Sequence, residues 1–309
     1  MKNQLAMGAA LALTISFSSY AQSTRQAVVE AEQSFAAQAA QAGTTAAFVA
    51  NSAPNALVAD NGKLVNAQEF WKAQPAKSGS RLTWYPVLAD AAQSGDLGYT
   101  TGPWTSFQND KPQADGEYVT VWRKQPDGKW KFVVDMGIQR IGTAPAKPAT
   151  VPQPRLLAAA ATPSTAPSSV VLDLDRKFSE AEMMKPGATY QQYLSAEARL
   201  YRPGLSMMQG EAAAANMKNL EGRYFFAPTG GYLAAGGDLG YVVGEFRREA
   251  TPKHAEENGS YLRIWKREAV AGWKLVVEVF NNTEAPKDAK GAAAADGGGA
   301  TSEQANKRD

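Results

Sequence analysis

Two aspartates in this sequence have surroundings in which a carboxyl group could do chemistry. Asp135 lies in the stretch FVVDMG, between valines and a methionine. Burial among such side chains raises the pKa of a carboxyl group, which can then donate or accept a proton near neutral pH. Asp60 follows the extended stretch ALVA and precedes Asn61-Gly62. Asp135 and Asp60 are therefore the candidate catalytic residues. The alternative is a strand-end carboxylate for Asp135 and a turn residue for Asp60.

Aromatic residues recur at alternate positions of the stretches that read as strands. In the segment that begins at Tyr118, Tyr118 and Trp122 share one face, and Val119 and Val121 share the other. We interpret the aromatic set as the lining of a cavity for a flat apolar ligand, with ordinary core packing as the alternative. The predicted ligand-binding residues are Trp71, Trp84, Tyr99, Trp104, Tyr118, Trp122 and Asp135, with Tyr241, Tyr261, Trp265 and Glu278 in the second half of the chain.

Other side chains that commonly do chemistry are scarce. The 309 residues include no cysteine and a single histidine, His254. Thiolate metal sites, cysteine nucleophiles and three-histidine zinc sites are thereby excluded, and we expect neither a metal nor a cofactor. Lys and Arg number 32 against 30 for Asp and Glu. Such a balance is not typical of a nucleic-acid-binding protein.

An internal repeat organises the chain. Residues 95–105, GDLGYTTGPWT, recur as GDLGYVVGEFR at 237–247, and residues 116–135 recur at 259–278 as GSYLRIWKREAVAGWKLVVE. Upstream, VVEAEQSF matches VLDLDRKF at a similar offset. Blocks repeated in one order at nearly constant spacing indicate the duplication of a unit of about 115 residues.

The segments outside the repeat differ in composition. Residues 1–21 combine a positive start at Lys2, a short apolar run and the small residues Ser19 and Ala21, which is typical of a signal peptide and predicts a periplasmic or secreted protein without a membrane anchor after cleavage. Six prolines lie within residues 142–168, and such a chain acts as a semi-rigid spacer. We therefore expect a signal peptide over 1–21, a first unit over 22–141, a linker over 142–168, a second unit over 169–283 and a disordered tail over 284–309.

Within each unit, helices precede strands. The pattern predicts helices over 26–42, 46–50 and 68–74, an extended segment over 56–59, and strands over 81–90, 96–108, 118–124 and 130–137, the last two joined by a turn at Pro126-Asp127-Gly128. Helices followed by a curved antiparallel sheet constitute an α+β pattern.

These elements, with the GDLGYTTGPWT strand and the VWRKQPDGKWKFVVD hairpin, resemble the nuclear transport factor 2-like superfamily. The similarity is to its exported SnoaL-like, ketosteroid isomerase-homologue branch, the domain of unknown function 4440 type. The resemblance implies two tandem cone-shaped units, each with N-terminal helices packed on a curved sheet around a cavity. It also implies that the two units pair through their sheets as an intramolecular pseudo-dimer.

The resemblance bears on the candidate acids as well. In the family's isomerases the catalytic aspartate follows the first extended segment, near the place of Asp60, and a helix tyrosine completes an oxyanion hole where this chain has Phe35. Steroid-type isomerisation is therefore disfavoured.

Three functions are consistent with the sequence. We expect an exported protein that binds a small apolar or aromatic molecule in the first unit. The alternatives are a protein-interaction scaffold paired through its sheets, and an acid–base enzyme of isomerase or dehydratase type that uses Asp135 and Asp60.

Overall fold

The computed structural model describes residues 3–74, 78–156, 169–219 and 221–283, and for residues 3–22 it describes the backbone alone. The elements fall into two groups of the same order, helix–helix–strand–strand–helix and then strands, which we call the first and second units. The first unit comprises α1 (Asn3–Ala42), α2 (Thr44–Asn51), β1 (Ser52–Asp60), β2 (Lys63–Asn66), α3 (Ala67–Ala73), β3 (Ser80–Trp84), β4 (Leu88–Ala91), β5 (Leu97–Gln108), β6 (Lys111–Lys124) and β7 (Trp130–Gln139). The second comprises α4 (Ser169–Met184), α5 (Ala188–Tyr193), β8 (Leu194–Tyr201), β9 (Met208–Gln209), α6 (Gly210–Lys218), β10 (Tyr224–Leu233), β11 (Leu239–Arg248), β12 (Glu257–Glu268) and β13 (Gly272–Asn282).

Each unit forms one sheet. The strand orders are β2-β1-β7-β6-β5-β3, with β4 also on β5, and β10-β11-β12-β13-β8-β9. All pairs are antiparallel except β1 with β7 and β8 with β13, which are parallel. The α+β class and the two tandem units predicted from the sequence are confirmed, and the one parallel pair in each sheet is the feature that the local pattern did not predict.

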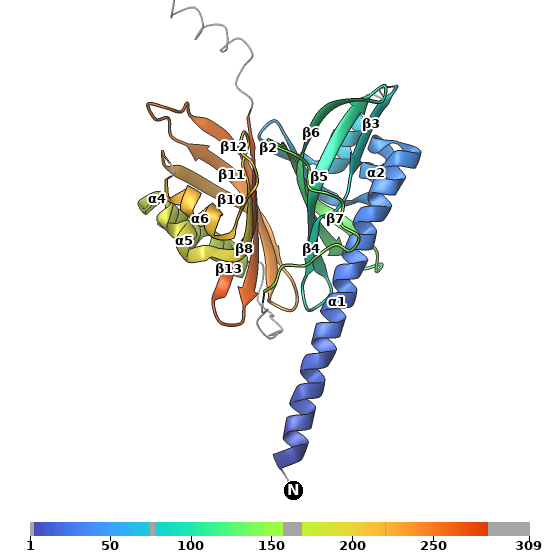
Figure 1. The fold of residues 1–309 in the computed structure, drawn as a ribbon, viewed down its shortest axis with the longest axis vertical. Helices are drawn as coiled ribbons and strands as arrows, with labels where there is room; N and C mark the ends of the chain where they lie inside the picture. Colours follow the sequence, from blue (N-terminus) through green and yellow to red (C-terminus); the bar gives the residue numbers. More distant parts are fainter. Residues whose placement is uncertain (1–2, 75–77, 157–168, 220, 284–309) are drawn as a thin grey trace, which may run out of the picture.

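The face of α1 that the sequence predicts to be buried is buried in the structure. Val28, Phe35 and Ala39 of α1 are buried, as their spacing predicts. Gly43 follows the helix at a φ of 90°, which an L side chain rarely adopts. The chain can therefore turn sharply from α1 into α2, and α1 and α2 lie against the same face of the sheet (Figure 1).

The predicted strand over 81–90 is two strands, β3 and β4. Pro86 separates them, and a proline has no N–H for the ladder. Pro228 occupies the equivalent place in β10, where the register with β11 shifts between Pro228 and Gly230. A proline thus interrupts the same ladder in both units, as a break in one and a bulge in the other.

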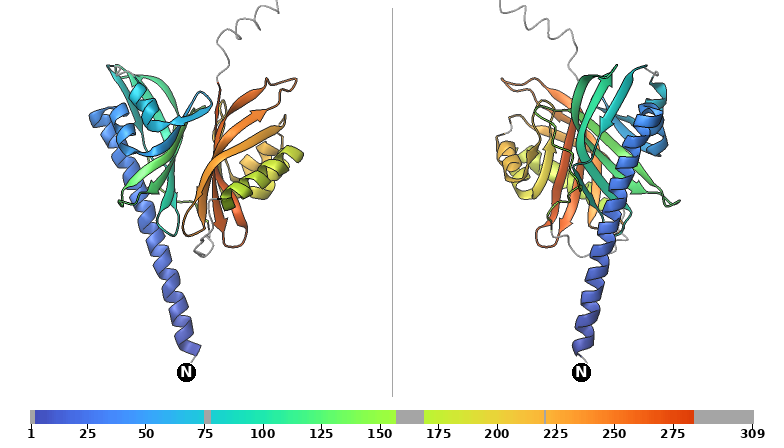
Figure 2. Two further views of the ribbon diagram at one scale, coloured as in Figure 1. Left: turned by 180° about the vertical axis from the view of Figure 1, so that it is seen from behind. Right: turned by 45° about the vertical axis from the view of Figure 1, so that its right-hand side comes forward.

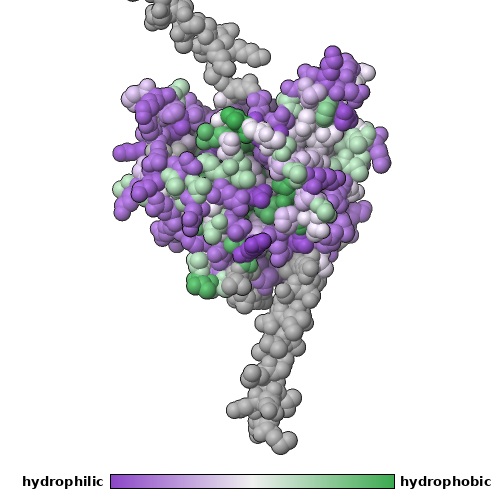
Figure 3. Space-filling view, viewed as in Figure 1, coloured by the Kyte–Doolittle hydropathy of each residue, from purple (hydrophilic) through white to green (hydrophobic). Residues whose placement is uncertain are grey.

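The two sheets face each other, with the helices on the outer sides (Figures 1 and 2). One hydrophobic cluster includes Val119 and Val121 of the first sheet together with Leu262 and Ile264 of the second. The chain is thus arranged as expected of an intramolecular pseudo-dimer. On the face that Figure 3 displays, hydrophilic residues predominate and hydrophobic ones form small groups.

The repeated GDLGY motif lies at this interface. Oδ2 of Asp96 accepts a hydrogen bond from the backbone N–H of Ala235 (3.1 Å), and Oδ2 of Asp238 accepts one from the backbone N–H of Gln93 (3.0 Å). Each aspartate thereby fixes the turn of the opposite unit. Both copies of the motif therefore make the same contact across the interface.

Further polar contacts join the units. Lys266 forms an ion pair with Asp90, and both side chains are at most one-tenth exposed. Asn281 accepts from the N–H of Gly62 (2.7 Å) and donates to the carbonyl of Gly137 (3.1 Å).

The described part of the predicted linker lies against the first unit. The N–H of Ala89 donates to the carbonyl of Pro152 (3.1 Å), and Arg25 donates to the carbonyl of Val151 (2.8 Å). The remainder of the linker, residues 157–168, and the predicted tail, 284–309, lie outside the described residues. No helix within the described ranges has the length and apolar character needed to cross a membrane.

Candidate functional site

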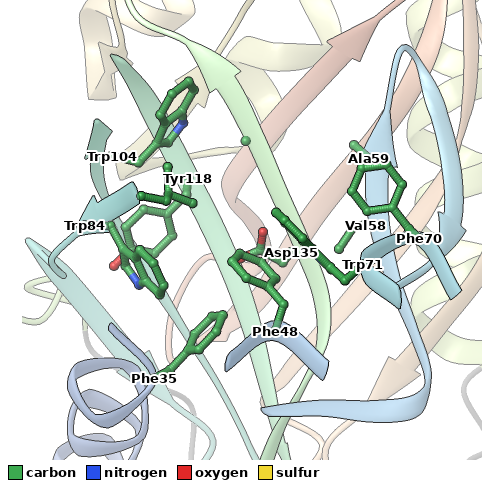
Figure 4. Close-up of a pocket in the computed structure, with 12 residues that line it drawn as sticks. Phe35, Phe48, Val58, Ala59, Phe70, Trp71, Trp84, Trp104, Tyr118 and Asp135 are labelled. Atoms are coloured by element: carbon green, nitrogen blue, oxygen red, sulfur yellow. The ribbon is translucent and has the colours of Figure 1, made fainter. Parts of the chain in front are cut away.

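A cavity of about 260 Å³ opens in the first unit between its helices and the face of the sheet that they cover (Figure 4). Its wall is almost entirely apolar or aromatic. Asp135 is the one charged side chain in it. The lining residues are Phe35, Phe48, Val58, Ala59, Phe70, Trp71, Leu82, Trp84, Trp104, Tyr118, Asp135 and Gly137.

Asp135 projects from the middle of the sheet into this cavity. Its strand β7 lies between β1 and β6, so Val58 and Thr120 flank it in the register. Thr120 donates a hydrogen bond from Oγ1 to Oδ2 of Asp135 (2.6 Å). Burial raises the pKa of Asp135 from 3.8 to about 7, and the Thr120 hydrogen bond only partly offsets this. Asp135 can therefore gain or lose a proton near neutral pH.

A second buried acid, Glu32 of α1, lies behind the cavity wall. It accepts hydrogen bonds from the indole N–H of Trp84 (2.6 Å) and of Trp122 (2.9 Å), and from the hydroxyl of Thr100. Burial raises its pKa, against the effect of these hydrogen bonds. Glu32 therefore fixes the orientation of Trp84, which forms part of the wall. Glu32 is not among the predicted site residues, although an acidic residue, Asp175, stands at its place in the second of the matched blocks.

The aromatic wall is built from α1, α2 and α3 and from the strands β3, β5 and β6. Phe48 stacks on Trp71 with ring centroids 4.1 Å apart, and Phe35 meets Trp84 edge to face at 4.7 Å. These contacts hold the rings in defined positions. The buried Nε1 of Trp71 has no hydrogen-bond partner in the described part of the chain.

Five of the predicted ligand-binding residues line the cavity, and two do not. Trp71, Trp84, Trp104, Tyr118 and Asp135 are in the lining. Tyr99 is buried on the opposite face of β5, with Asp90 and Arg199 nearby. Trp122 is fully buried against Glu32. Asp60 is exposed opposite Lys63 at the β1–β2 turn.

Tyr99 and Trp122 lie outside the lining for separate reasons. Successive residues of a strand point to opposite faces, so Tyr99 faces the second unit while Thr100 faces Glu32. Trp122 has the predicted phase, but it lies deeper under α1 than the cavity reaches.

In the second unit, a guanidinium group fills the equivalent region. Arg263 is fully buried; its Nε donates to Glu278 (2.6 Å) and its Nη1 to Asp175 (3.3 Å). Arg202 forms a second ion pair with Glu278. Burial alone would raise the pKa of Glu278, but the guanidinium groups of Arg202 and Arg263 outweigh burial, so its pKa is lowered.

Two of the three predicted aromatic residues of the second unit contact this network. Tyr261 donates to Asp175 (2.7 Å), and Trp265 donates to the same carboxylate (3.2 Å). Tyr241, in contrast, belongs with the hydrophobic cluster between the sheets and does not contact this network.

A second cavity of about 460 Å³ lies between the units and beneath the linker. Arg140 and Glu117 of the first unit and Arg199 and Tyr201 of the second are in its lining. Burial raises the pKa of Glu117, and Arg140 opposes this at 3.6 Å. Within the described residues no group of three or more His, Cys, Asp or Glu is placed to hold a metal ion.

No family model matches the sequence, and no curated protein matches it. Several solved structures are similar. A nuclear transport factor 2-like superfamily protein from Salmonella enterica is 10% identical, covering 38% of this chain and 92% of its own, with a TM-score of 0.31. A ketosteroid isomerase-like protein from Erwinia carotovora is 11% identical over 38% and 97%, with a TM-score of 0.34.

A putative ketosteroid isomerase from Parabacteroides distasonis is 18% identical over 36% of this chain and 84% of its own, with a TM-score of 0.29. Each is matched over most of its own length and over little more than a third of this chain.

Proposed function

We propose that this protein binds a small aromatic or apolar molecule in the cavity of the first unit, with Asp135 as the polar anchor. The observation that carries the proposal is the cavity itself: an aromatic wall around one carboxyl group (Figure 4). Such a wall with few polar groups is typical of small-molecule sites. A scaffold with no ligand would not require an open, carboxyl-bearing cavity.

The size of the cavity limits the ligand. A cavity of about 150 Å³ is sufficient for benzene, so the cavity of about 260 Å³ accommodates a molecule of one or two rings. Phe48, Trp71 and Trp84 would contact the faces and edges of such rings.

A ligand-binding experiment with the full chain tests this proposal. Bicyclic aromatic molecules such as naphthol and indole are titrated while tryptophan fluorescence is recorded. Trp104→Ala removes part of the wall and is expected to weaken binding at least tenfold. Phe246→Ala is the matched control, since Phe246 occupies the place of Trp104 in the second unit. Equal loss in both variants, or no binding to the wild-type protein, would contradict the proposal.

Acid–base catalysis at the same cavity is the second candidate function. It is favoured by one observation: a half-buried carboxyl group with a pKa of about 7 inside an apolar cavity. If Asp135 transfers protons, the rate of conversion of a bound carbonyl compound changes with pH around 7, and Asp135→Asn abolishes turnover while the ligand still binds. If the wild-type protein binds such a compound without converting it, Asp135 is a binding residue and not a catalytic one.

We also propose that the protein is exported to the periplasm or secreted. The support is the sequence of residues 1–21, with its positive start, apolar run and small residues before Gln22. The site for a ligand would then meet molecules outside the cytoplasm.

A further inference from the structure

The second unit holds a guanidinium group inside an aromatic cage. The Cζ atom of Arg263 lies 4.4 Å from the ring centroid of Phe178, 3.9 Å from that of Phe226 and 4.5 Å from that of Tyr261. Two carboxylates, Asp175 and Glu278, complete the cage. Rings and carboxylates together recognise a cation by cation–π attraction and by charge-assisted hydrogen bonds.

The strand registers and the repeat together give each member of this cage a counterpart in the first unit. Glu278 is opposite Arg263, as Asp135 is opposite Thr120. Phe226 pairs with Phe246 as Trp84 pairs with Trp104. The remaining equivalences follow from the repeat: Phe178 with Phe35, Tyr261 with Tyr118, and Asp175 with Glu32, since the last two accept from Trp265 and Trp122 in the same way.

The first unit therefore has four of the five cage members without the cation, and the fifth, Glu32, lies behind the cavity wall. Phe35, Trp84, Tyr118 and Asp135 all line the cavity. Thr120 stands where the second unit has Arg263, and a threonine is too short to bring a cation into this space. In the described part of the chain, no Lys, Arg or His forms an ion pair with Glu32 or Asp135.

We infer that the molecule bound in the first unit carries a positively charged nitrogen group, an amidinium, guanidinium or ammonium, attached to an aromatic or apolar body. This inference rests on the proposed function, because it takes the cavity to be a ligand site. The charged group occupies the place of the Arg263 guanidinium and donates to Asp135. The apolar body extends toward Phe48 and Trp71, which close the cavity on the helix side (Figure 4).

A pair of matched ligands tests the inference on the full chain. Benzamidinium and benzamide have nearly the same shape and differ in charge. Calorimetry is expected to show benzamidinium binding at least tenfold more tightly than benzamide, and Asp135→Asn is expected to remove the preference. If both bind equally to the wild-type protein, the inference fails while the proposed function stands. If neither binds, nor any neutral aromatic molecule, the proposed function fails as well.

Two substitutions at Thr120 provide a second test. Thr120→Arg places a guanidinium in the cavity, as in the second unit, and is expected to abolish benzamidinium binding without unfolding the chain. Thr120→Val is the matched control, since it removes the hydroxyl and leaves the cavity open. Benzamidinium binding that survives Thr120→Arg in a folded protein overturns the inference.

The cage of the second unit gives a test that does not depend on Asp135 variants. Arg263→Ala is expected to lower the melting temperature, and millimolar methylguanidinium is expected to restore part of the loss. Methylurea is the neutral control of similar shape and should restore nothing. Equal restoration by both compounds, or by neither, shows that the cage does not select a free cation and contradicts the inference.

Discussion

The carboxyl group of Asp135 lies in a place that favours its protonated form, and this has a measurable cost for stability. Its pKa is raised from 3.8 to about 7 by burial. Between these values the unfolded chain has already released the proton, while the folded chain retains it. The contribution of the protonated Asp135 to the free energy of unfolding is therefore fully present below about pH 4 and is lost as pH rises through about 7. Replacing Asp135 by Asn removes the titration and keeps the shape.

The magnitude follows from the two pKa values. At about 1.4 kcal/mol per pKa unit, the difference between 3.8 and about 7 corresponds to about 4 kcal/mol for a carboxyl group that water cannot reach. Asp135 is only half-buried at the cavity wall, so solvent screens part of its charge. We therefore expect Asp135→Asn to be about 2 kcal/mol more stable than the wild-type protein at pH 8, and of nearly equal stability at pH 4.

Urea unfolding at pH 4 and pH 8, followed by tryptophan fluorescence, measures this difference. Asp60→Asn is the control, because Asp60 is exposed at a turn and its replacement should leave the free energy of unfolding unchanged at both pH values. A variant of Asp135 that is destabilised equally at pH 4 and pH 8 would refute the reasoning. It would show that the carboxyl group is ionised without penalty in the folded protein.

Three other predictions concern separate parts of the chain. N-terminal sequencing of exported protein is expected to begin at Gln22, and an intact Met1 would count against the predicted signal peptide. Trp122→Phe leaves Glu32 with one hydrogen-bond donor fewer in a buried site and is expected to cost about 1–3 kcal/mol in chemical denaturation. Lys266→Met leaves Asp90 buried between the sheets without its cation and should cost about 3–5 kcal/mol; an unchanged midpoint would mean that water reaches this pair.

Local patterns predicted most of the elements. The spacing of apolar residues in 26–42 predicted the buried face of α1, and Phe35 and Ala39 lie on it. Pro126-Asp127-Gly128 predicted the β6–β7 turn, where Gly128 has a φ of 81°. These features depend on residues close in sequence, which is why they can be recognised there.

Contacts between distant residues were not predictable in this way. The parallel pairing of β1 with β7 joins Val58 to Asp135, 77 positions apart, and no local signal marks it. The sequence placed Tyr99 in the ligand site because aromatic residues recur along the strand, but the strand's alternation turns it toward the other unit. Phase relative to the sheet, rather than residue type, decides which aromatic residues line the cavity.

One difference between the two copies of the repeat indicates, from the sequence alone, that their interiors differ. Aligning VTVW of the first copy with LRIW of the second sets Thr120 against Arg263, an uncharged residue against a charged one at a position buried in both. A buried charge requires a partner, so this single difference indicates that the interiors of the two units do different things. Its meaning becomes clear only when Asp175 and Glu278 are seen beside the guanidinium.

The contacts of Asp96 and Asp238 have a consequence for the protein at low concentration. In a dimer of separate chains, such reciprocal hydrogen bonds would be lost on dilution, because association depends on protein concentration. Here both partners belong to one chain, so each turn meets its aspartate at an effective concentration set by the tether. The second sheet therefore stays packed against the sheet that carries Asp135 at any protein concentration. The cavity in the first unit keeps its shape for the same reason.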